Sequence, residues 1–121
     1  MDTSLDSLDP QFWLTAIEFL ARTVEARVPV VVTNTRRSAD EQAACVARGV
    51  SWVKHSKHEA GRALDVCPIS IYSGGGATKL DWNPDDPVWE RLGALGESVG
   101  LVWGGRWSPH RDVSHFEAPD P

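Results

Sequence analysis

The 121-residue sequence is poor in several features, and each scarcity excludes a class of protein. It contains two cysteines, Cys45 and Cys67, which form neither a CxxC unit nor a disulfide framework, so we expect free thiols in a reducing compartment. No apolar run approaches the length of a membrane span, and we therefore expect no stable membrane association. Lysine and arginine (12) are outnumbered by aspartate and glutamate (17), and the net charge of −5 argues against a nucleic-acid partner.

The first residues of the sequence do not have the pattern of a secretory signal peptide. These residues, MDTSLDSLDP, are acidic and polar, whereas a secretory signal peptide has a basic start followed by an apolar run. We therefore expect synthesis in the cytoplasm. The sequence also lacks repeats and low-complexity segments, and its length predicts a single domain over residues 1–121, which we expect to be monomeric.

Three amphipathic helices are predicted. The first begins at Asp9, an N-cap followed by proline, and continues to about residue 26. The second runs from a capping box at Ser38 to about residue 47, and the third begins near Asp85 and ends at Gly100. The apolar faces expected to pack on the core are Trp13, Ile17, Leu20 and Val24 in the first helix and Val88, Leu92, Leu95 and Val99 in the third.

Extended segments are predicted between and after these helices. A β-branched run covers residues 28–34, and RALDVCP is a strand that Pro68 should end. Further along, LVWGGRW is a strand that runs into a glycine turn, and VSHFEA is the closing strand. The pattern predicts an α+β fold in which about three helices pack on a small, mainly antiparallel sheet.

The segment SKHEAGRALD places His58 in a polar turn and Asp65 in an apolar strand. A buried carboxylate without a partner is costly, so Asp65 should be paired, hydrogen-bonded or bound to a metal. Gly61 would allow the tight turn that folds His58 back over that strand, and His115 lies in the closing strand. Two imidazoles and one carboxylate suit Zn²⁺, and three protein ligands leave one coordination position open, as in catalytic sites.

Asp112 lies three residues before His115, where a carboxylate could act as general base on water at the metal. Other interpretations stay open: the histidines could be ordinary core or surface residues, and Asp112 could pair with Arg111 or cap a turn. An iron site of two histidines and one carboxylate normally has a histidine and the carboxylate two residues apart, not seven as here. Cys67 follows Asp65 by two positions and could be a ligand, although a small buried hydrophobic residue is favoured.

The same segment matches the pattern S-x-H-x-x-G-x-A-x-D at Ser56, His58, Gly61, Ala63 and Asp65. Together with DVSHFE, it resembles the zinc D-Ala-D-Ala carboxypeptidase and L-alanyl-D-glutamate peptidase family, which includes vancomycin-resistance enzymes and several phage endolysins. TRRSADEQ and VWGGRW resemble two further segments of that family, and all four follow the family's order. The resemblance covers about residues 8–118 and implies the fold shared by D-Ala-D-Ala peptidases and the hedgehog signalling domain.

The resemblance implies a role for each matched position. His58, Asp65 and His115 would bind Zn²⁺. Asp112 would be the general base, and an aspartate rather than a glutamate there is similar to the endolysin branch. The residues that would support the ligands or contact the substrate are Ser56, Gln42, Trp103 and Glu117.

Arginines occupy two further positions that the resemblance singles out. Arg37 would stabilise the developing oxyanion or bind a substrate carboxylate. Arg36 could hold this role instead, and an ordinary surface ion pair is the alternative for Arg37. Arg106 follows Trp-Gly-Gly, where the family often has an acidic residue, so this position departs from the family pattern.

The implied function is that of a zinc metallopeptidase that hydrolyses the stem peptides of bacterial peptidoglycan. The aspartate base favours the L-alanyl-D-glutamate endopeptidase of a phage endolysin, which would act on the cell wall after release from the cytoplasm. A D-Ala-D-Ala carboxypeptidase or dipeptidase is the alternative within the family. From other classes, a non-catalytic zinc-bearing binding module or a structural component of a phage particle also fits the sequence.

Overall fold

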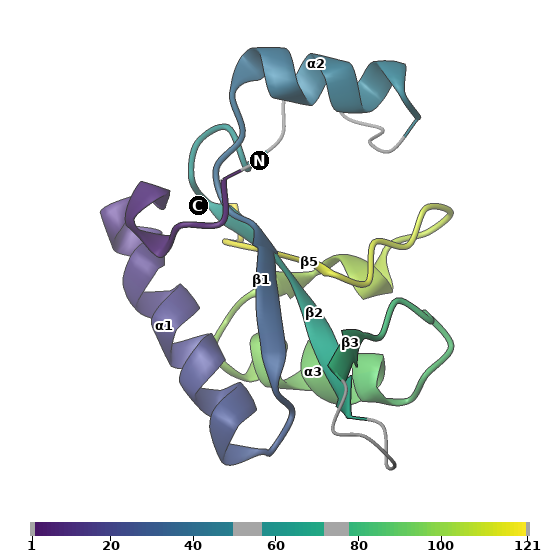
Figure 1. Ribbon diagram of the computed structural model, residues 1–121. Coiled ribbons are helices and arrows are strands. Elements are labelled where there is room, and N and C mark those ends of the chain that lie inside the picture. Colours follow the sequence, from purple (N-terminus) through teal and green to yellow (C-terminus); the bar gives the residue numbers. More distant parts are fainter. Residues whose placement is uncertain (1, 50–56, 72–77, 121) are drawn as a thin grey trace.

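The computed structural model describes residues 2–49, 57–71 and 78–120, which form three α-helices and a sheet of short strands (Figure 1). None of these helices is long and apolar enough to cross a membrane. The elements in chain order are η1 (Leu5–Ser7), α1 (Pro10–Glu25), β1 (Val30–Asn34), α2 (Ala39–Ala47), β2 (Ala63–Ile71), β3 (Thr78–Leu80), α3 (Val88–Ser98), β4 (Val102–Trp103), η2 (Gly104–Arg106) and β5 (His115–Glu117).

The sheet is antiparallel throughout its described pairs, in the order β1-β2-β5-β4, with β3 paired to the far end of β2. This arrangement confirms the predicted α+β fold. Within it, Asp65 of β2 is opposite Asn34 of β1 on one side and His115 of β5 on the other. Because residues directly opposite in an antiparallel pair have neighbouring side chains on the same face, the sheet alone brings Asp65 and His115 together.

Two strand predictions need correction. Strand β2 does not end at Pro68 but continues to Ile71, and β3 was not predicted. Pro68 is tolerated because it lies between the stretch of β2 that pairs with β5 and the stretch that pairs with β3. Its missing N–H therefore removes no ladder hydrogen bond on that side, while its carbonyl still accepts a bond from Asp81 N at 2.9 Å.

Helices α1 and α3 cover the face of the sheet that carries Leu64 and Phe116, which are opposite one another and fully buried. Phe19 of α1 packs on Phe116 with ring centroids 4.5 Å apart. Since successive residues of a strand point to opposite faces, Asp65 and His115 lie on the other face of the sheet. Helix α2 lies at the end of the sheet where β1 ends and β2 begins (Figure 1).

The predicted apolar face of α1 is wrong by one position along the helix. Trp13, Ile17 and Val24 are 39%, 41% and 74% exposed, and Leu20 is only partly buried. The helix carries a second stripe at the same spacing, and this stripe holds the two phenylalanine rings that fill the core. Thr23 can belong to it because its hydroxyl donates to the Leu20 carbonyl at 2.6 Å. The buried residues of α1 are Phe12, Ala16, Phe19 and Thr23.

The predicted face of α3 is partly right, because Leu92 is fully buried while Val88, Leu95 and Val99 pack at the edge of the core. The centre of the buried face consists of Trp89, Leu92, Gly93 and Gly96.

The two glycines let α3 approach the sheet closely. A Cβ on Gly96 would lie 2.5 Å from a ring carbon of Phe116, and one on Gly93 would lie 2.3 Å from a ring carbon of Trp103. Both rings are fully buried, so neither can move aside without disturbing the core.

We predict that Gly96→Ala destabilises the protein, although alanine is the better helix former by about 1 kcal/mol. Overpacking of a buried ring costs roughly 1–3 kcal/mol and should exceed that gain. Urea denaturation would measure the difference. Gly49→Ala is the matched control, because nothing lies within 4 Å of its Cβ and only the strain of its φ of +74° applies. Stability of Gly96→Ala equal to that of wild type would contradict close packing of α3.

Candidate metal centre

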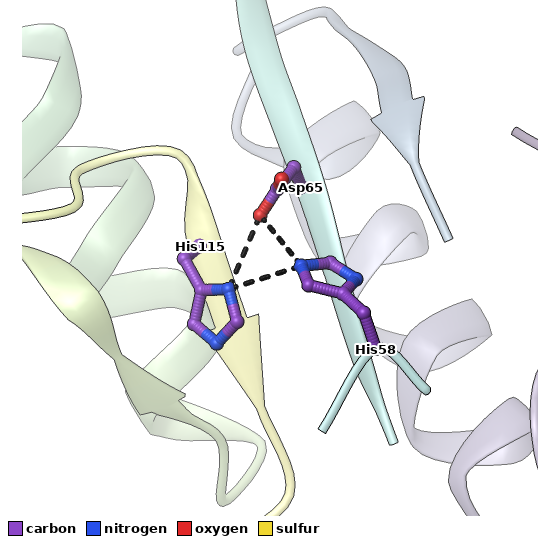
Figure 2. Close-up of side chains that lie close together, drawn as sticks. All are labelled: His58, Asp65 and His115. Atoms are coloured by element: carbon purple, nitrogen blue, oxygen red, sulfur yellow. Dashed lines mark hydrogen bonds and ion pairs between the residues drawn. The ribbon is translucent and has the colours of Figure 1, made fainter. Parts of the chain in front are cut away.

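His58, Asp65 and His115 converge on the sheet face opposite α1 and α3 (Figure 2). His58 Nε2 and His115 Nδ1 each lie 3.3 Å from Asp65 Oδ1, and the two ring nitrogens are 3.2 Å apart. His58 is 2% and His115 6% exposed. In the described part of the chain, this is the group of acidic, histidine and cysteine side chains whose atoms lie close enough to hold a metal ion.

The turn before β2 positions His58 next to Asp65 and His115. Gly61 has a φ of +69°, and a Cβ there would lie 2.7 Å from Asp9 N, so this position requires glycine, as predicted. The Gly61 carbonyl accepts a bond from Asp9 N at 2.9 Å, and the His58 carbonyl accepts one from Arg37 N at 3.0 Å. The start of α1 and the segment after β1 therefore fix the turn.

Both imidazole rings are oriented by hydrogen bonds on their outer sides. His58 Nδ1 lies 2.6 Å from the Thr35 carbonyl oxygen, which can only accept, so Nδ1 carries a proton. His115 Nε2 lies 2.8 Å from Glu117 Oε1. Such partners fix the ring orientation of metal-binding histidines and direct the other nitrogen inward. Here the inward atoms are His58 Nε2 and His115 Nδ1.

The three inward atoms fit a zinc ion. Nitrogen and oxygen ligands at the usual 2.0–2.1 Å from tetrahedral zinc are about 3.3 Å apart, and the atoms of His58, Asp65 and His115 are 3.2–3.3 Å apart. Asp65 Oδ1 is buried and accepts no well-aligned hydrogen bond from a described residue. A metal ion would satisfy this oxygen.

The surroundings also favour positive charge at this point. Burial raises the pKa of Asp65, but the two imidazoles outweigh burial and hold it well below the usual range. Burial lowers the pKa of His115, whereas Asp65 and Glu117 raise it by more, to about 9. Both shifts arise from the attraction between the carboxylates and the imidazole rings.

The Trp-Gly-Gly segment holds Asp112 beside the cluster. The Gly104 carbonyl accepts a bond from Asp112 N at 2.9 Å, and a Cβ on Gly104 would lie 2.4 Å from the Asp112 carbonyl oxygen and 3.2 Å from His115 Cβ. Trp103 Nε1 donates to the Val113 carbonyl at 2.8 Å. Burial, and then the charge of Asp65, raise the pKa of the Asp112 carboxyl.

Two roles were predicted for Trp103, support of the metal ligands or contact with substrate, and its surroundings favour support. Its side chain is 1% exposed, and its bond to the Val113 carbonyl supports the segment that carries Asp112. Trp107, which sequence reasoning missed, is 37% exposed and lies with its ring centroid 5.1 Å from that of His115. Trp107 belongs to the segment VWGGRW, and this membership could have pointed to it from the sequence.

Of the two neighbouring arginines, Arg37 is buried and Arg36 is exposed. Arg37 is 9% exposed, and its Nη1 donates to Oε1 of the buried Gln42. The proposed surface ion pair is wrong, because the guanidinium is buried and has no carboxylate partner among the described residues. Its Nε is buried without a hydrogen-bond partner there. Arg36 is exposed and donates to the Ser7 carbonyl at 3.4 Å.

Three residues from the sequence analysis remain. Ser56 lies outside the described residues. Arg106 binds Glu97 through two nitrogens at 3.0 and 3.2 Å and Glu90 at 3.2 Å, so it ties the Trp-Gly-Gly turn to α3. Cys67 is fully buried, donates to the Asp81 carbonyl at 3.3 Å, and stands outside the cluster as a small core residue.

The sequence profile of the family described as D-alanyl-D-alanine carboxypeptidase matches residues 49–118, more than half of the chain. The chain belongs to the D-alanyl-D-alanine carboxypeptidase family. This membership confirms the resemblance, and the structure shows the predicted His-Asp-His group. An L-alanyl-D-glutamate peptidase of Listeria phage A118 is 32% identical over 91 residues, which are 74% of this chain and only 30% of the phage protein.

Solved structures of two peptidases share the fold of this family member. The Serratia marcescens L-Ala D-Glu endopeptidase ChiX superposes with a TM-score of 0.70 at 21% identity, over 95% of this chain and 83% of that one. A Zn(II) complex of the vancomycin-resistance D,D-pentapeptidase VanY gives a TM-score of 0.61 at 14% identity, over 92% and 72% of the two chains.

We predict that the protein binds one Zn²⁺ ion and that His58→Ala weakens this binding by more than about 100-fold, because it removes a direct ligand. Titration with Zn²⁺ against a competing chelator would measure the affinity. His110→Ala is the matched control, since His110 is exposed and outside the cluster, and it should leave the affinity unchanged. Equal losses in both variants would contradict the site.

Proposed function

We propose that this protein is a zinc metallopeptidase that hydrolyses an amide bond in the peptide stems of bacterial peptidoglycan, foremost as an L-alanyl-D-glutamate endopeptidase. The observation that carries the proposal is the convergence of His58, Asp65 and His115 at 3.2–3.3 Å beside the half-buried Asp112. The phage peptidase at 32% identity supports the choice of bond. The enzyme would act on the cell wall after release.

His58, Asp65 and His115 would hold the zinc ion through Nε2, a carboxylate oxygen and Nδ1. Zinc held there would supply Lewis acidity, which polarises a carbonyl group and makes water a stronger nucleophile near neutral pH. Thr35 and Glu117 keep the two rings in place from outside.

Asp112 would act as the general base and then as the general acid. Its carboxylate would take a proton from the attacking water and pass that proton to the leaving amine. The segment is suited to this task because Gly104 and Trp103 fix its backbone, and because Ser114 Oγ lies 3.4 Å from Asp112 Oδ1. These contacts support a carboxyl group that is oriented before substrate arrives.

Arg37 would stabilise the oxyanion that develops on the scissile carbonyl or bind a carboxylate of the substrate. Its guanidinium is held from one side by Gln42, and its buried Nε has no described partner. A buried donor without a partner is costly, and movement of the Arg37 side chain toward an incoming oxygen atom would relieve that cost.

A D-Ala-D-Ala carboxypeptidase or dipeptidase is the second candidate. The description of the matching family and the fold shared with VanY favour it. A zinc-bearing binding module is the candidate from another class, and it predicts zinc binding without hydrolysis.

Digestion of purified peptidoglycan, followed by mass analysis, would separate these candidates. We expect wild type to release new L-Ala carboxyl and D-Glu amino ends. Asp112→Asn should bind zinc normally yet lose roughly 10²–10⁴-fold in rate, because the proton acceptor is gone. Asp85→Asn, which changes an exposed aspartate in the same way, should be unaffected. Release of D-Ala alone would move the protein to the carboxypeptidase branch, and zinc binding without cleavage would favour the binding module.

Arg37→Lys and Arg36→Lys form a matched pair of neighbouring substitutions. Lysine keeps the charge but loses the planar fork of donors. We expect Arg37→Lys to lower kcat/KM by roughly 10²–10³-fold, as for a lost oxyanion donor, and Arg36→Lys to have little effect. Steady-state kinetics on a synthetic stem peptide would show whether the loss lies in kcat, as for an oxyanion contact, or in KM, as for a substrate carboxylate. A larger loss in Arg36→Lys would contradict this assignment.

A further inference from the structure

Lys57 lies next to His58 in the chain, but its side chain binds the segment that carries and follows His115. Its Nζ lies 2.9 Å from Glu117 Oε2 and 2.9 Å from Asp120 Oδ1, and it donates to the Ala118 carbonyl oxygen at 2.6 Å. An ammonium group has three donors, and each of them has one partner here. Lys57 thus joins the turn before β2 to the end of β5, the two segments that supply the histidines.

Glu117 divides its two oxygens between Lys57 and His115. Its Oε2 binds Lys57 Nζ at 2.9 Å, and its Oε1 lies 2.8 Å from His115 Nε2. The Glu117 side chain is only 15% exposed, so water does not readily replace either partner. With both oxygens engaged, the carboxylate has one orientation, and this orientation aims Oε1 at the imidazole ring.

We propose that Lys57 is a positioning residue of the metal centre. It holds Glu117, which orients His115, and so it raises the affinity of the site for its metal ion. This inference rests on the proposed zinc site and adds to it a residue that touches neither metal nor substrate.

The charge of Lys57 alone would have the opposite effect, because a cation near the site should weaken the binding of another cation. That charge is, however, already balanced by Glu117 and Asp120. Loss of Lys57 would leave Glu117 with one partner and free rotation about its side-chain bonds. Loss of this preorganisation should therefore exceed the relief of repulsion.

Zn²⁺ affinity, measured by chelator competition well below the unfolding temperature, tests this proposal. Partners of ligand histidines contribute about 10–100-fold to metal affinity, and we expect Lys57→Met to weaken binding by about 10-fold, since it acts one step further out. Lys57→Arg, which keeps a charged donor for Glu117, should restore most of the affinity. Asp120→Asn is the matched control, because Asp120 is 87% exposed and contacts Lys57 but not His115. It should change the affinity less than about two-fold.

A double substitution separates positioning from general stability. If Lys57 acts through Glu117, Lys57→Met combined with Glu117→Gln should bind Zn²⁺ no more weakly than Glu117→Gln alone. The visible spectrum of bound Co²⁺ should change in Lys57→Met and return in Lys57→Arg. If Lys57→Met does not fold, Lys57→Gln, which keeps a donor for the Ala118 carbonyl, serves in its place.

The outcomes are distinguishable. Absence of Zn²⁺ binding in wild type would overturn the proposed function and this inference with it. Tight binding in wild type with unchanged affinity in Lys57→Met would overturn this inference alone, even if the melting temperature falls. Tighter binding in Lys57→Met would show that charge repulsion dominates, and would also overturn it.

Discussion

The pairing of β2 with β5 is the constraint on which the rest of the site depends. The register places Asp65 opposite His115, so backbone hydrogen bonds, and not the metal, set the spacing of these two side chains. The third residue, His58, comes from a turn that returns directly into β2 through Gly61. The turn at Gly104 then brings Asp112 to the same place. The Gly104 backbone lies so close to the Asp112 carbonyl that no side chain would fit between them.

The same strand pair carries the core on its opposite face. Leu64 and Phe116 are opposite one another and lie under α1 and α3, one position along from Asp65 and His115. A slip of one residue in the pairing would turn the polar side chains into the core and the apolar ones out of it. Hydrophobic packing therefore specifies the register of the site, and the glycines of α3 take part in this packing.

The sequence was most informative where the chemistry is local. SKHEAGRALD contains two of the three converging residues and the glycine of the turn between them, so this part of the candidate site could be predicted. The buried face of α1 could not, because two stripes share one spacing and only contact with the Phe116 ring selects Phe19 over Ile17. The carbonyl of Thr35 has no side-chain signature, and the bond from Lys57 to Glu117 joins residues sixty positions apart.

The balance of charge explains why a metal ion, and not a further side chain, suits the centre. Asp65 and Asp112 place two carboxylates in a largely buried region. Among the described residues, Lys57 pairs with Glu117 and Asp120, and Arg37 donates to Gln42. In the described part of the chain, Asp65 forms ion pairs with the two inward-facing imidazole nitrogens and with no lysine or arginine. A compact divalent ion would supply positive charge at the point where those atoms meet. A long lysine or arginine side chain could reach that point only by displacing the imidazoles.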